Sequence, residues 1–306
     1  MEVNTLHPVF AAELIGPDLS QAQDAALVAL VEDLMREHAV LCIRGQGHIS
    51  DADHLRFARA FGPLELPPGY EVRKDQPGRM APELYDASNL DAHGEIIERA
   101  SLRAKFSKGN ELFHADSSFN DMPSKWSMLR GVIVPPERGD TQFVDLRHVY
   151  DALPQAMKDR IEPLVAEHSF AASRLKGGLD AAEAERIKAG MPGTRQPMVR
   201  ISPSGRKALF VGSHAYAVVG MDDVAGQALI DELLAFASQE RFIYAHKWRQ
   251  GDFLIWDNRC TLHRGTEFDY ETYKRDLRRA NVNESGDERS AVPTFATLGA
   301  DPVKAG

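Results

Sequence analysis

The sequence predicts a mainly β fold with flanking helices (α+β), most simply a β-sandwich or jelly roll. Short apolar runs recur along the chain, and most are bounded by Gly, Pro, Asn or Asp residues that favour turns. A few longer stretches repeat their apolar residues at three- and four-residue intervals, which is the helical period. Many short strands with helices inserted between them are typical of sandwiches and jelly rolls.

The composition excludes several classes of partner. The chain has 306 residues, of which 43% are hydrophobic and 26% are charged, as in ordinary globular proteins. Its formal net charge of −9 argues against nucleic acid or an acidic membrane as a partner. A small anionic organic substrate is compatible with this charge, because a few local arginines are enough to bind it. A homo-oligomer is also compatible.

The cysteines and the N-terminus predict the compartment. Cys42 and Cys260 form no C-x-x-C pair and no disulfide framework, which favours a reducing, cytoplasmic location. The first residues lack a basic segment followed by an apolar one, so we expect no signal peptide. No apolar run approaches the roughly 18–20 residues that a membrane-spanning helix needs, so we expect no membrane partner.

The N-terminal part is predicted to supply scaffold. Residues 1–19 have the pattern of a strand followed by a turn. Ser20 is a suitable N-cap for an amphipathic helix over residues 21–38. A short buried strand over 40–43 and a second helix over 51–61 follow. Two helices ahead of a β-rich region suit packing against a sheet.

Residues 66–82 are rich in Pro, Gly and charged side chains, and they predict a loop. Loops of this length often act as lids or binding loops, and disorder without a function is the alternative. Residues 84–90 have the pattern of another strand, whereas residues 91–110 are mostly polar.

The middle of the chain alternates between strand and helix patterns. Strands are predicted over 126–134 and 141–146, and helices over 145–153 and 154–165. Residues 175–190 are charged, rich in alanine and bracketed by glycines. We expect a helical insert there, near the mouth of a site, with a solvated surface excursion as the alternative.

The last part is predicted to return to the sheet. Short strands are expected over 198–201, 208–211 and 253–256, and residues 202–205, which read S-P-S-G, predict a hairpin turn between the first two. An amphipathic helix is expected over 222–238.

Residues 113–119 read F-H-A-D-S-S-F and predict a short strand. Strand side chains alternate between faces, so His114 and Asp116 are expected to point the same way. An imidazole beside a carboxylate supplies two of the three ligands of a 2-His-1-carboxylate facial triad, which holds iron(II) and leaves positions open for chemistry. Taken alone, the pair is better explained as a polar patch on a solvated strand face.

A second motif, over residues 251–265, supplies a third candidate ligand. A Gly-Asp turn leads into an apolar run, a polar break and then His263 beside Arg264 and Gly265. Because His263 is far from Asp116 in the sequence, the fold must bring the two together. Two imidazoles and a carboxylate suit Fe(II), and a zinc site with an open position would use the same three ligands.

Together, H-x-D and W-D-N-R-x-x-x-H-R-G resemble the TauD/TfdA family of Fe(II)- and 2-oxoglutarate-dependent dioxygenases, over roughly residues 41–282. The resemblance implies a double-stranded β-helix, or jelly-roll, core in a single domain over 1–306. It implies that His114, Asp116 and His263 are the metal ligands and the catalytic centre. Fe(II), 2-oxoglutarate and O2 are then the implied cofactor and cosubstrates.

A charge run over 274–279 continues into an apolar stretch that predicts a strand. On a strand Arg275 and Arg279 share one face, and a guanidinium is shaped to bind a carboxylate with two hydrogen bonds. The resemblance implies that Arg275 binds the far carboxylate of 2-oxoglutarate and that Arg279 binds the anion of the substrate. Relatives place the first arginine one residue closer to the histidine, where this chain has Lys274, so a register shifted by one is the alternative. A solvated charged face is the other alternative.

Two further residues take roles only from the resemblance. Thr141 begins the strand predicted over 141–146, and its hydroxyl is implied to donate to the same carboxylate of 2-oxoglutarate. A threonine chosen for its β propensity is the alternative. His214 lies in a G-x-H-A stretch that resembles relatives of the phenoxyalkanoate type, which implies a substrate-binding position on the pocket wall.

The motif sequences look most like the aryloxyalkanoate branch, whose members include 2,4-dichlorophenoxyacetate dioxygenase. In that branch, hydroxylation beside the ether oxygen gives a hemiacetal that collapses to a phenol and an oxoacid. A taurine or alkylsulfonate dioxygenase of the same family is the first alternative. A zinc hydrolase that uses the same ligands and a non-catalytic binding protein are alternatives from other classes.

Overall fold

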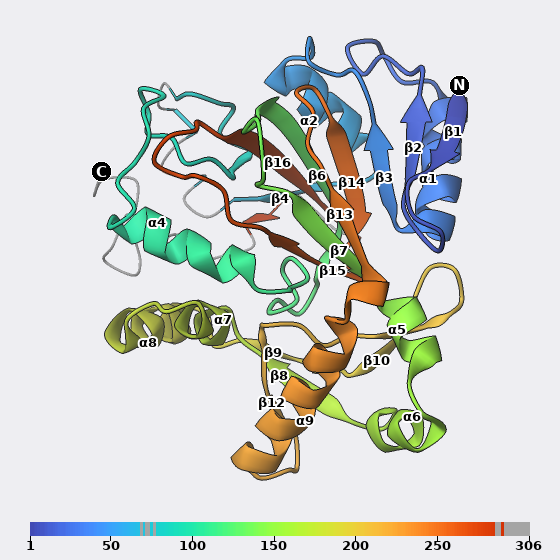
Figure 1. Cartoon of the computed structure of the whole chain (residues 1–306), viewed down its shortest axis with the longest axis vertical. Helices are drawn as coiled ribbons and strands as arrows, with labels where there is room; N and C mark the ends of the chain where they lie inside the picture. Colours follow the sequence, from blue (N-terminus) through green and yellow to red (C-terminus); the bar gives the residue numbers. More distant parts are fainter. Residues whose placement is uncertain (68–69, 71–73, 76–77, 285–288, 291–306) are drawn as a thin grey trace.

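The computed structural model describes residues 1–67, 70, 74–75, 78–284 and 289–290. Within them, nine strands form one large sheet across the molecule (Figure 1). Their spatial order is β1 (Glu2–Thr5), β2 (Ala12–Ile15), β3 (Val40–Ile43), β14 (Phe253–Asp257), β6 (Ser124–Ile133), β16 (Asp276–Asn283), β4 (Leu64–Leu66) and β17 (Arg289–Ser290), with β5 (Tyr85–Asp86) beside β16. Apart from two parallel pairs, β2 with β3 and β4 with β17, neighbouring strands run antiparallel.

A smaller antiparallel sheet packs against the large one. Its strands are, in order, β13 (Ile243–His246), β7 (Thr141–Asp145) and β15 (Thr261–Gly265). Leu129, Leu254 and Trp256 of the large sheet share one buried cluster with Phe143 and Tyr244 of the small sheet. Two sheets with their apolar faces together form the jelly-roll core that the sequence predicted.

Helices α1 (Ala25–His38) and α2 (Asp51–Arg59) lie over the outer face of the large sheet (Figure 1). Val31 of α1 and Phe57 of α2 share a buried cluster with Phe253, Ile255 and Val282 of the sheet. Both helices were predicted from their periodicity, and both act as scaffold, because this burial removes their apolar faces from water.

The predicted N-cap of the first helix is wrong. Helix α1 begins at Ala25, and Asp24 caps it by accepting a hydrogen bond from the backbone of Leu27 at 2.8 Å. Ser20 instead lies in a turn, where its backbone N–H donates to Asp18. Asp and Ser cap helices about equally well, so the position of the preceding turn decides where the helix begins.

The residues between β7 and β13 form a second layer, which is drawn below the core in Figure 1. Its elements are α5 (Leu146–Ala152), α6 (Gln155–Ile161), β8 (Val165–His168), α7 (Phe170–Lys176), α8 (Ala181–Gly190), β9 (Thr194–Pro197), β10 (Val199–Ile201), β11 (Lys207–Leu209), β12 (Ala215–Val218), α9 (Asp223–Ala237) and η2 (Glu240–Phe242). The helices predicted over 145–153, 175–190 and 222–238 and the hairpin turn over 202–205 are confirmed.

Some predicted boundaries are wrong. The helix predicted over 154–165 ends at Ile161, because residues 165–168 pair with β9 and β12 instead. Of the strand predicted over 84–90, only Tyr85–Asp86 forms β5. The polar stretch 91–110 contains a helix, α4 (Leu102–Ser107), and the start of a 3-10 turn, η1 (Lys108–Glu111).

Residues 113–119 do not form the predicted strand. His114 forms a single bridge with His263, and residues 116–119 turn away from the sheet. Ser117 adopts a φ of 56°, which a continuous strand does not allow. The small residues Ala, Ser and Ser between the two phenylalanines therefore make a turn, and the turn rather than strand alternation aims Asp116.

The proposed lid over 66–82 includes residues 68–69, 71–73 and 76–77, which lie outside the described residues, so the lid remains a prediction. The single domain over 1–306 also remains a prediction. Among the described residues, no helix is long and apolar enough to cross a lipid bilayer.

The Gly-Asp turn before β14 offers a test of the fold. Gly251 has a φ of 84°, and a Cβ there would lie 2.6 Å from the backbone nitrogen of Gly47. Gly205 has a similar φ of 79°, but a Cβ there would meet nothing within 4 Å. We predict that Gly205→Ala costs about 1–2 kcal/mol of unfolding free energy through backbone strain alone.

Gly251→Ala should cost clearly more than Gly205→Ala, because the backbone of residues 46–47 must also move. Urea unfolding of the two variants measures the difference directly. Equal losses would show that the close approach of Gly251 and Gly47 contributes nothing to stability.

Candidate active site

Three of the predicted residues meet at the edge of the small sheet. His263 lies on β15, His114 pairs with it in the one-residue bridge, and Asp116 follows in the turn. The His114 Nε2 lies 3.8 Å from Asp116 Oδ1, and the His263 Nε2 lies 3.8 Å from Asp116 Oδ2. All three side chains are buried, and one ligand atom from each lies within 4.8 Å of the others. This spacing surrounds a position for one metal ion.

The two imidazoles are neutral, as metal ligands must be. The His114 Nδ1 lies 2.7 Å from the carbonyl oxygen of Leu112, which only accepts, so Nδ1 carries the proton and Nε2 keeps its lone pair. Burial lowers the pKa of His114 to about 4. Burial and the neighbouring His114 hold the pKa of His263 well below its usual value. The His114 Nε2 is therefore available to a cation at neutral pH, and the uncharged His263 ring does not repel one.

Asp116 is held as a carboxylate from three directions. Arg279 donates to its Oδ1 at 2.8 Å, Ser127 donates to its Oδ2 at 2.6 Å, and its backbone N–H donates to Asn258 at 3.1 Å. Burial alone would raise the pKa of Asp116, but the charge of Arg279 and the hydrogen bond from Ser127 hold it below the usual range. Two neutral nitrogens and one charged oxygen fit a divalent cation such as Fe(II).

A cavity of about 160 Å³ opens beside these ligands. Five of the predicted residues line it, namely His114, His263, Thr141, Arg275 and Arg279. Trp256 also lines the cavity, and its ring lies 4.6 Å from the ring of His263. A small ligand in this cavity would reach the metal position and both arginines.

Arg279, on β16, and Arg275, which directly precedes that strand, both face the cavity, as their spacing predicted. Leu277 between them is buried between the two sheets, whereas Arg278 points to the other face and pairs with Asp51 at 2.8 Å. Lys274, the alternative to Arg275, lies outside and pairs with Glu95 at 3.1 Å. Geometry therefore favours the predicted register over the shifted one.

The partly buried guanidinium of Arg275 has no acidic partner among the described side chains. Its nearest acceptors are the carbonyl oxygens of Ala87 and Gly139, both at 3.4 Å, and its Nε has none. Burial lowers its pKa to about 10. A partly buried unpaired charge is costly, so this position is built to receive an anion.

Thr141 is oriented by Trp248, which the sequence did not reveal. The indole Nε1–H of Trp248 donates to Thr141 Oγ1 at 3.0 Å. Because an indole only donates, the hydroxyl proton of Thr141 stays available for a ligand in the cavity. Gly131 gives the indole room, since a Cβ there would lie 3.1 Å from the Trp248 ring. No periodicity or motif marks Trp248, because its role depends on a contact between separate strands.

His214 is not on the cavity wall. Its buried ring lies edge-on to His114 with 5.7 Å between the centroids, and its Nδ1 lies 3.0 Å from Ser118 Oγ. Its Nε2 has no partner among the described residues. His214 is thus next to the metal position, and its substrate-binding role remains a prediction.

Asn258 connects the two motifs and was overlooked, although it lies within W-D-N-R. Its Oδ1 accepts from the backbone of Asp116 at 3.1 Å and from Trp256 Nε1 at 3.0 Å, while its Nδ2 donates to Ser127 at 2.9 Å. The motif itself was the available signal. An asparagine in the motif that carries a candidate metal ligand suggests a hydrogen-bonding role. The sequence does not show which atoms it binds.

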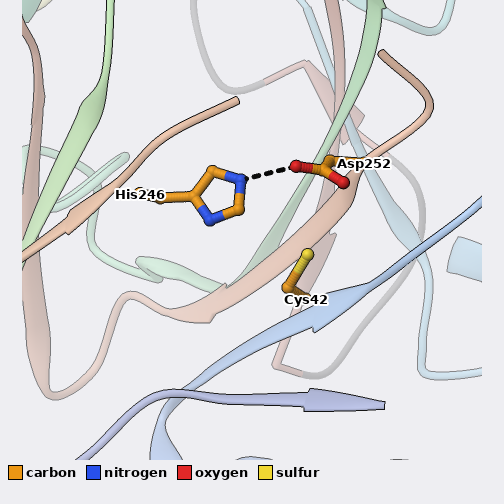
Figure 2. A group of neighbouring side chains, drawn as sticks. All are labelled: Cys42, His246 and Asp252. Atoms are coloured by element: carbon orange, nitrogen blue, oxygen red, sulfur yellow. Dashed lines mark hydrogen bonds and ion pairs between the residues drawn. The ribbon is translucent and has the colours of Figure 1, made fainter. Parts of the chain in front are cut away.

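A second group of possible ligands, Cys42, His246 and Asp252, lies elsewhere in the core (Figure 2). His246 Nε2 lies 2.9 Å from Asp252 Oδ2, and Arg44 donates to the same oxygen at 2.7 Å. The other ring nitrogen of His246 lies 3.0 Å from the hydroxyl of Tyr244. Burial raises the pKa of the Cys42 thiol. Arg44 already supplies the positive charge here, so the group is a satisfied structural network.

The fold and the site together define a class. A jelly roll that carries a buried 2-His-1-carboxylate set, beside a cavity with an arginine awaiting an anion, is typical of non-haem iron oxygenases. The comparisons with known proteins agree with this class. The family model described as "Taurine catabolism dioxygenase TauD, TfdA family" matches residues 2–281.

Similar proteins with a named activity cover nearly the whole chain. The alpha-ketoglutarate-dependent 2,4-dichlorophenoxyacetate dioxygenase of Cupriavidus pinatubonensis is 43% identical over 282 residues, which is 91% of this chain and 96% of that protein. The (S)-phenoxypropionate/alpha-ketoglutarate-dioxygenase of Sphingobium herbicidovorans is 34% identical over 90% of this chain and 92% of its own. A crystal structure of AAD-2 with Mn(II) and N-oxalylglycine superposes with a TM-score of 0.83 at 34% identity and covers 94% of this chain and 99% of its own.

This chain belongs to the TauD/TfdA family. It is a non-haem iron dioxygenase that depends on 2-oxoglutarate, also called alpha-ketoglutarate, and uses Fe(II) and O2. The zinc hydrolase and the non-catalytic binding protein, which the ligand types left open, are set aside by this membership.

The ligand assignment predicts a specific loss. Asp116→Ala should remove the only negative charge among the three ligands and weaken binding of Mn²⁺, used as a stand-in for Fe(II), by at least a hundredfold. Electron paramagnetic resonance of free Mn²⁺ measures this without any turnover. Wild-type affinity in a folded Asp116→Ala protein would remove the facial triad from consideration.

Proposed function

We propose that this enzyme hydroxylates an aryloxyalkanoate, such as 2,4-dichlorophenoxyacetate, beside its ether oxygen. The observation that carries the proposal is the 43% identity, over almost the full length of both chains, to a dioxygenase named for that substrate. The solved structure described as a taurine dioxygenase from Burkholderia xenovorans is more distant, at 25% identity and a TM-score of 0.74. An aryloxyalkanoate is therefore favoured over an alkylsulfonate.

His114, Asp116 and His263 are proposed to hold Fe(II). When bound, the iron supplies activation of O2, coupled to conversion of 2-oxoglutarate to succinate and carbon dioxide. The protein positions the reacting groups and excludes water from them. Trp256 and Phe143 pack against the ring of His263, with centroids 4.6 and 6.2 Å away, and so shield this ligand from water on that side.

Arg275 and Thr141 are proposed to bind the far carboxylate of 2-oxoglutarate. That carboxylate would neutralise the partly buried guanidinium, and the Thr141 hydroxyl would donate one more hydrogen bond to it. Arg275, just before β16, and Thr141, on β7, line the same cavity. Together they would fix the distance from the far carboxylate to the metal position.

Arg279 is proposed to bind the carboxylate of the substrate. One of its nitrogens holds Asp116 at 2.8 Å, its Nε has no partner among the described residues, and its guanidinium lies 4.8 Å above the ring of Tyr85. The planar guanidinium can thus hold Asp116 with one edge and bind a second anion with another edge. A lysine has no such planar group.

The reaction follows from the position of the oxygen that is inserted. A hydroxyl placed on the carbon between the ether oxygen and the carboxylate makes a hemiacetal, which releases a phenol and leaves an oxoacid. Both free cysteines, Cys42 and Cys260, are buried, and we propose the cytoplasm as the compartment of this reaction.

A substrate panel tests the function. Aryloxyacetates, both enantiomers of 2-aryloxypropionates, and taurine are compared by oxygen uptake, succinate formation and release of phenol. We expect phenol and succinate in equal amounts with at least one aryloxyalkanoate. Faster coupled turnover of taurine than of every aryloxyalkanoate would contradict the proposal.

The cosubstrate site gives a sharper test. Arg275→Ala should raise the apparent KM for 2-oxoglutarate by about tenfold to a hundredfold, because a hydrogen bond to a charged group contributes roughly 1.5–3 kcal/mol. Lys274→Ala is the matched control, since Lys274 is exposed and pairs with Glu95. The register is wrong if the control, and not Arg275→Ala, raises that KM.

Arg279→Ala separates substrate from cosubstrate. We predict a larger rise in the apparent KM for the aryloxyalkanoate than for 2-oxoglutarate, and a lower ratio of phenol to succinate. Arg279→Lys should recover little, because an ammonium keeps the charge but loses the planar group. An unchanged ratio together with an unchanged substrate KM would assign the substrate carboxylate to another residue.

A further inference from the structure

A buried carboxylate lies behind the metal ligands, outside the cavity. Glu65, on β4, accepts hydrogen bonds from four side chains. Its Oε1 accepts from Ser117 at 2.6 Å, from Tyr85 at 2.8 Å and from Asn281 at 3.1 Å, and its Oε2 accepts from Ser124 at 2.7 Å. These donors come from β5, β6, β16 and the turn after His114, so Glu65 joins separate parts of the fold.

The first donor leads directly to Asp116. Ser117 is the next residue, and its φ of 56° lies in the left-handed region, which disfavours a residue with a side chain. Its carbonyl accepts from the backbone of Asn120 at 2.9 Å and closes the turn. The short, buried hydrogen bond to Glu65 holds this strained residue in place, and with it the direction in which Asp116 leaves the backbone.

The second donor reaches the other side of Asp116. Because the Nδ2 of Asn281 donates to Glu65, its Oδ1 faces the hydroxyl of Ser127, 2.9 Å away. That hydroxyl also lies 2.6 Å from Asp116 Oδ2, so its single proton is shared between two acceptors and is held more strongly by the charged and closer oxygen. Anchoring of the Asn281 amide therefore fixes the surroundings of the Ser127 hydroxyl that binds Asp116.

The third donor, Tyr85, is connected to the Oδ1 of Asp116 through Arg279. Glu65 holds the hydroxyl of Tyr85 at 2.8 Å, the guanidinium of Arg279 lies 4.8 Å above the Tyr85 ring, and Arg279 donates to Asp116 Oδ1 at 2.8 Å. Three of the four donors thus lead to Asp116, by its backbone and by each of its oxygens. Ser124 contacts neither Asp116 nor a side chain that binds Asp116. Its hydroxyl accepts a hydrogen bond from the Asn281 Nδ2 at 3.3 Å, which is longer than the 3.1 Å hydrogen bond from that nitrogen to Glu65.

We propose that Glu65 is a positioning residue for the metal site, which fixes the Asp116 carboxylate in its ligating orientation through Ser117, Asn281 and Tyr85. This rests on the proposed assignment of His114, Asp116 and His263 as the ligands. Groups that orient metal ligands typically change metal affinity by roughly tenfold to a hundredfold when they are replaced. Glu65 touches neither the cavity nor the metal position, so its effect should appear in metal affinity before any substrate is added.

The alternative to a positioning role is that Glu65 belongs to a buried polar network that only stabilises the fold. Two serines separate the alternatives, because each donates one hydroxyl to Glu65 at nearly the same distance and both are buried. Ser117→Ala and Ser124→Ala should lower the urea midpoint of the metal-free protein by similar amounts. Only Ser117→Ala should also weaken Mn²⁺ binding, by about tenfold, while Ser124→Ala stays within about twofold of wild type.

Glu65→Gln completes the test, because an amide keeps the shape but replaces one acceptor by a donor. We expect a loss of Mn²⁺ affinity of about tenfold to a hundredfold, measured by electron paramagnetic resonance without 2-oxoglutarate. In the double variant Glu65→Gln/Ser117→Ala the loss should be smaller than the product of the two single losses, since both break one hydrogen bond. If Glu65→Gln does not fold, the serine pair alone decides.

Equal loss of Mn²⁺ affinity in both serine variants, or no loss in either, would overturn the positioning role. Asp116→Ala keeps this failure distinct from failure of the ligand assignment. If Asp116→Ala loses Mn²⁺ and Ser117→Ala does not, the ligands stand and only Glu65 is misassigned. If Asp116→Ala binds Mn²⁺ as wild type does, the ligand assignment itself is wrong, and the Glu65 role falls with it.

Discussion

The metal site depends on one pair of backbone hydrogen bonds. His114 and His263 exchange both of their N–H and C=O groups, at 3.0 and 2.9 Å, in a bridge one residue long. Residues paired in this way place their side chains on the same face of the sheet, and here the two rings lie 4.2 Å apart. The chain then turns at Ser117, so Asp116 completes the set without extending the strand.

Charge balance explains why the surrounding residues are polar although they are buried. The charge of Asp116 would be costly in the interior without Arg279 and Ser127. Arg279 donates a hydrogen bond to one carboxylate oxygen, and Ser127 donates one to the other. Arg275, in contrast, is left without an acid among the described side chains. The buried charge of Asp116 is thus matched within the protein, whereas the partly buried charge of Arg275 is left for an anionic ligand. This asymmetry separates the proposed metal ligands from the proposed cosubstrate position.

The scaffold serves the site at a distance. In the cluster of Cys42, His246 and Asp252, the ring of His246 lies edge-on to Trp248, 5.0 Å away. Trp248 in turn donates to Thr141 at the cavity wall. A satisfied network in the core therefore supports the orientation of one hydroxyl at the proposed cosubstrate site. Glu65 has the corresponding place behind Asp116.

The sequence by itself determined the elements whose signal is local. The apolar periods of α1, α2 and α9, the hairpin turn over 202–205 and the two histidine motifs can each be read from neighbouring residues. The spacing of Arg275 and Arg279 also predicted that both side chains face the same way. The tertiary structure decided the rest, because it depends on contacts between distant segments. Residues 113–119 became a bridge and a turn because of His263, and the roles of Trp248 and Glu65 exist only through partners far away in the chain.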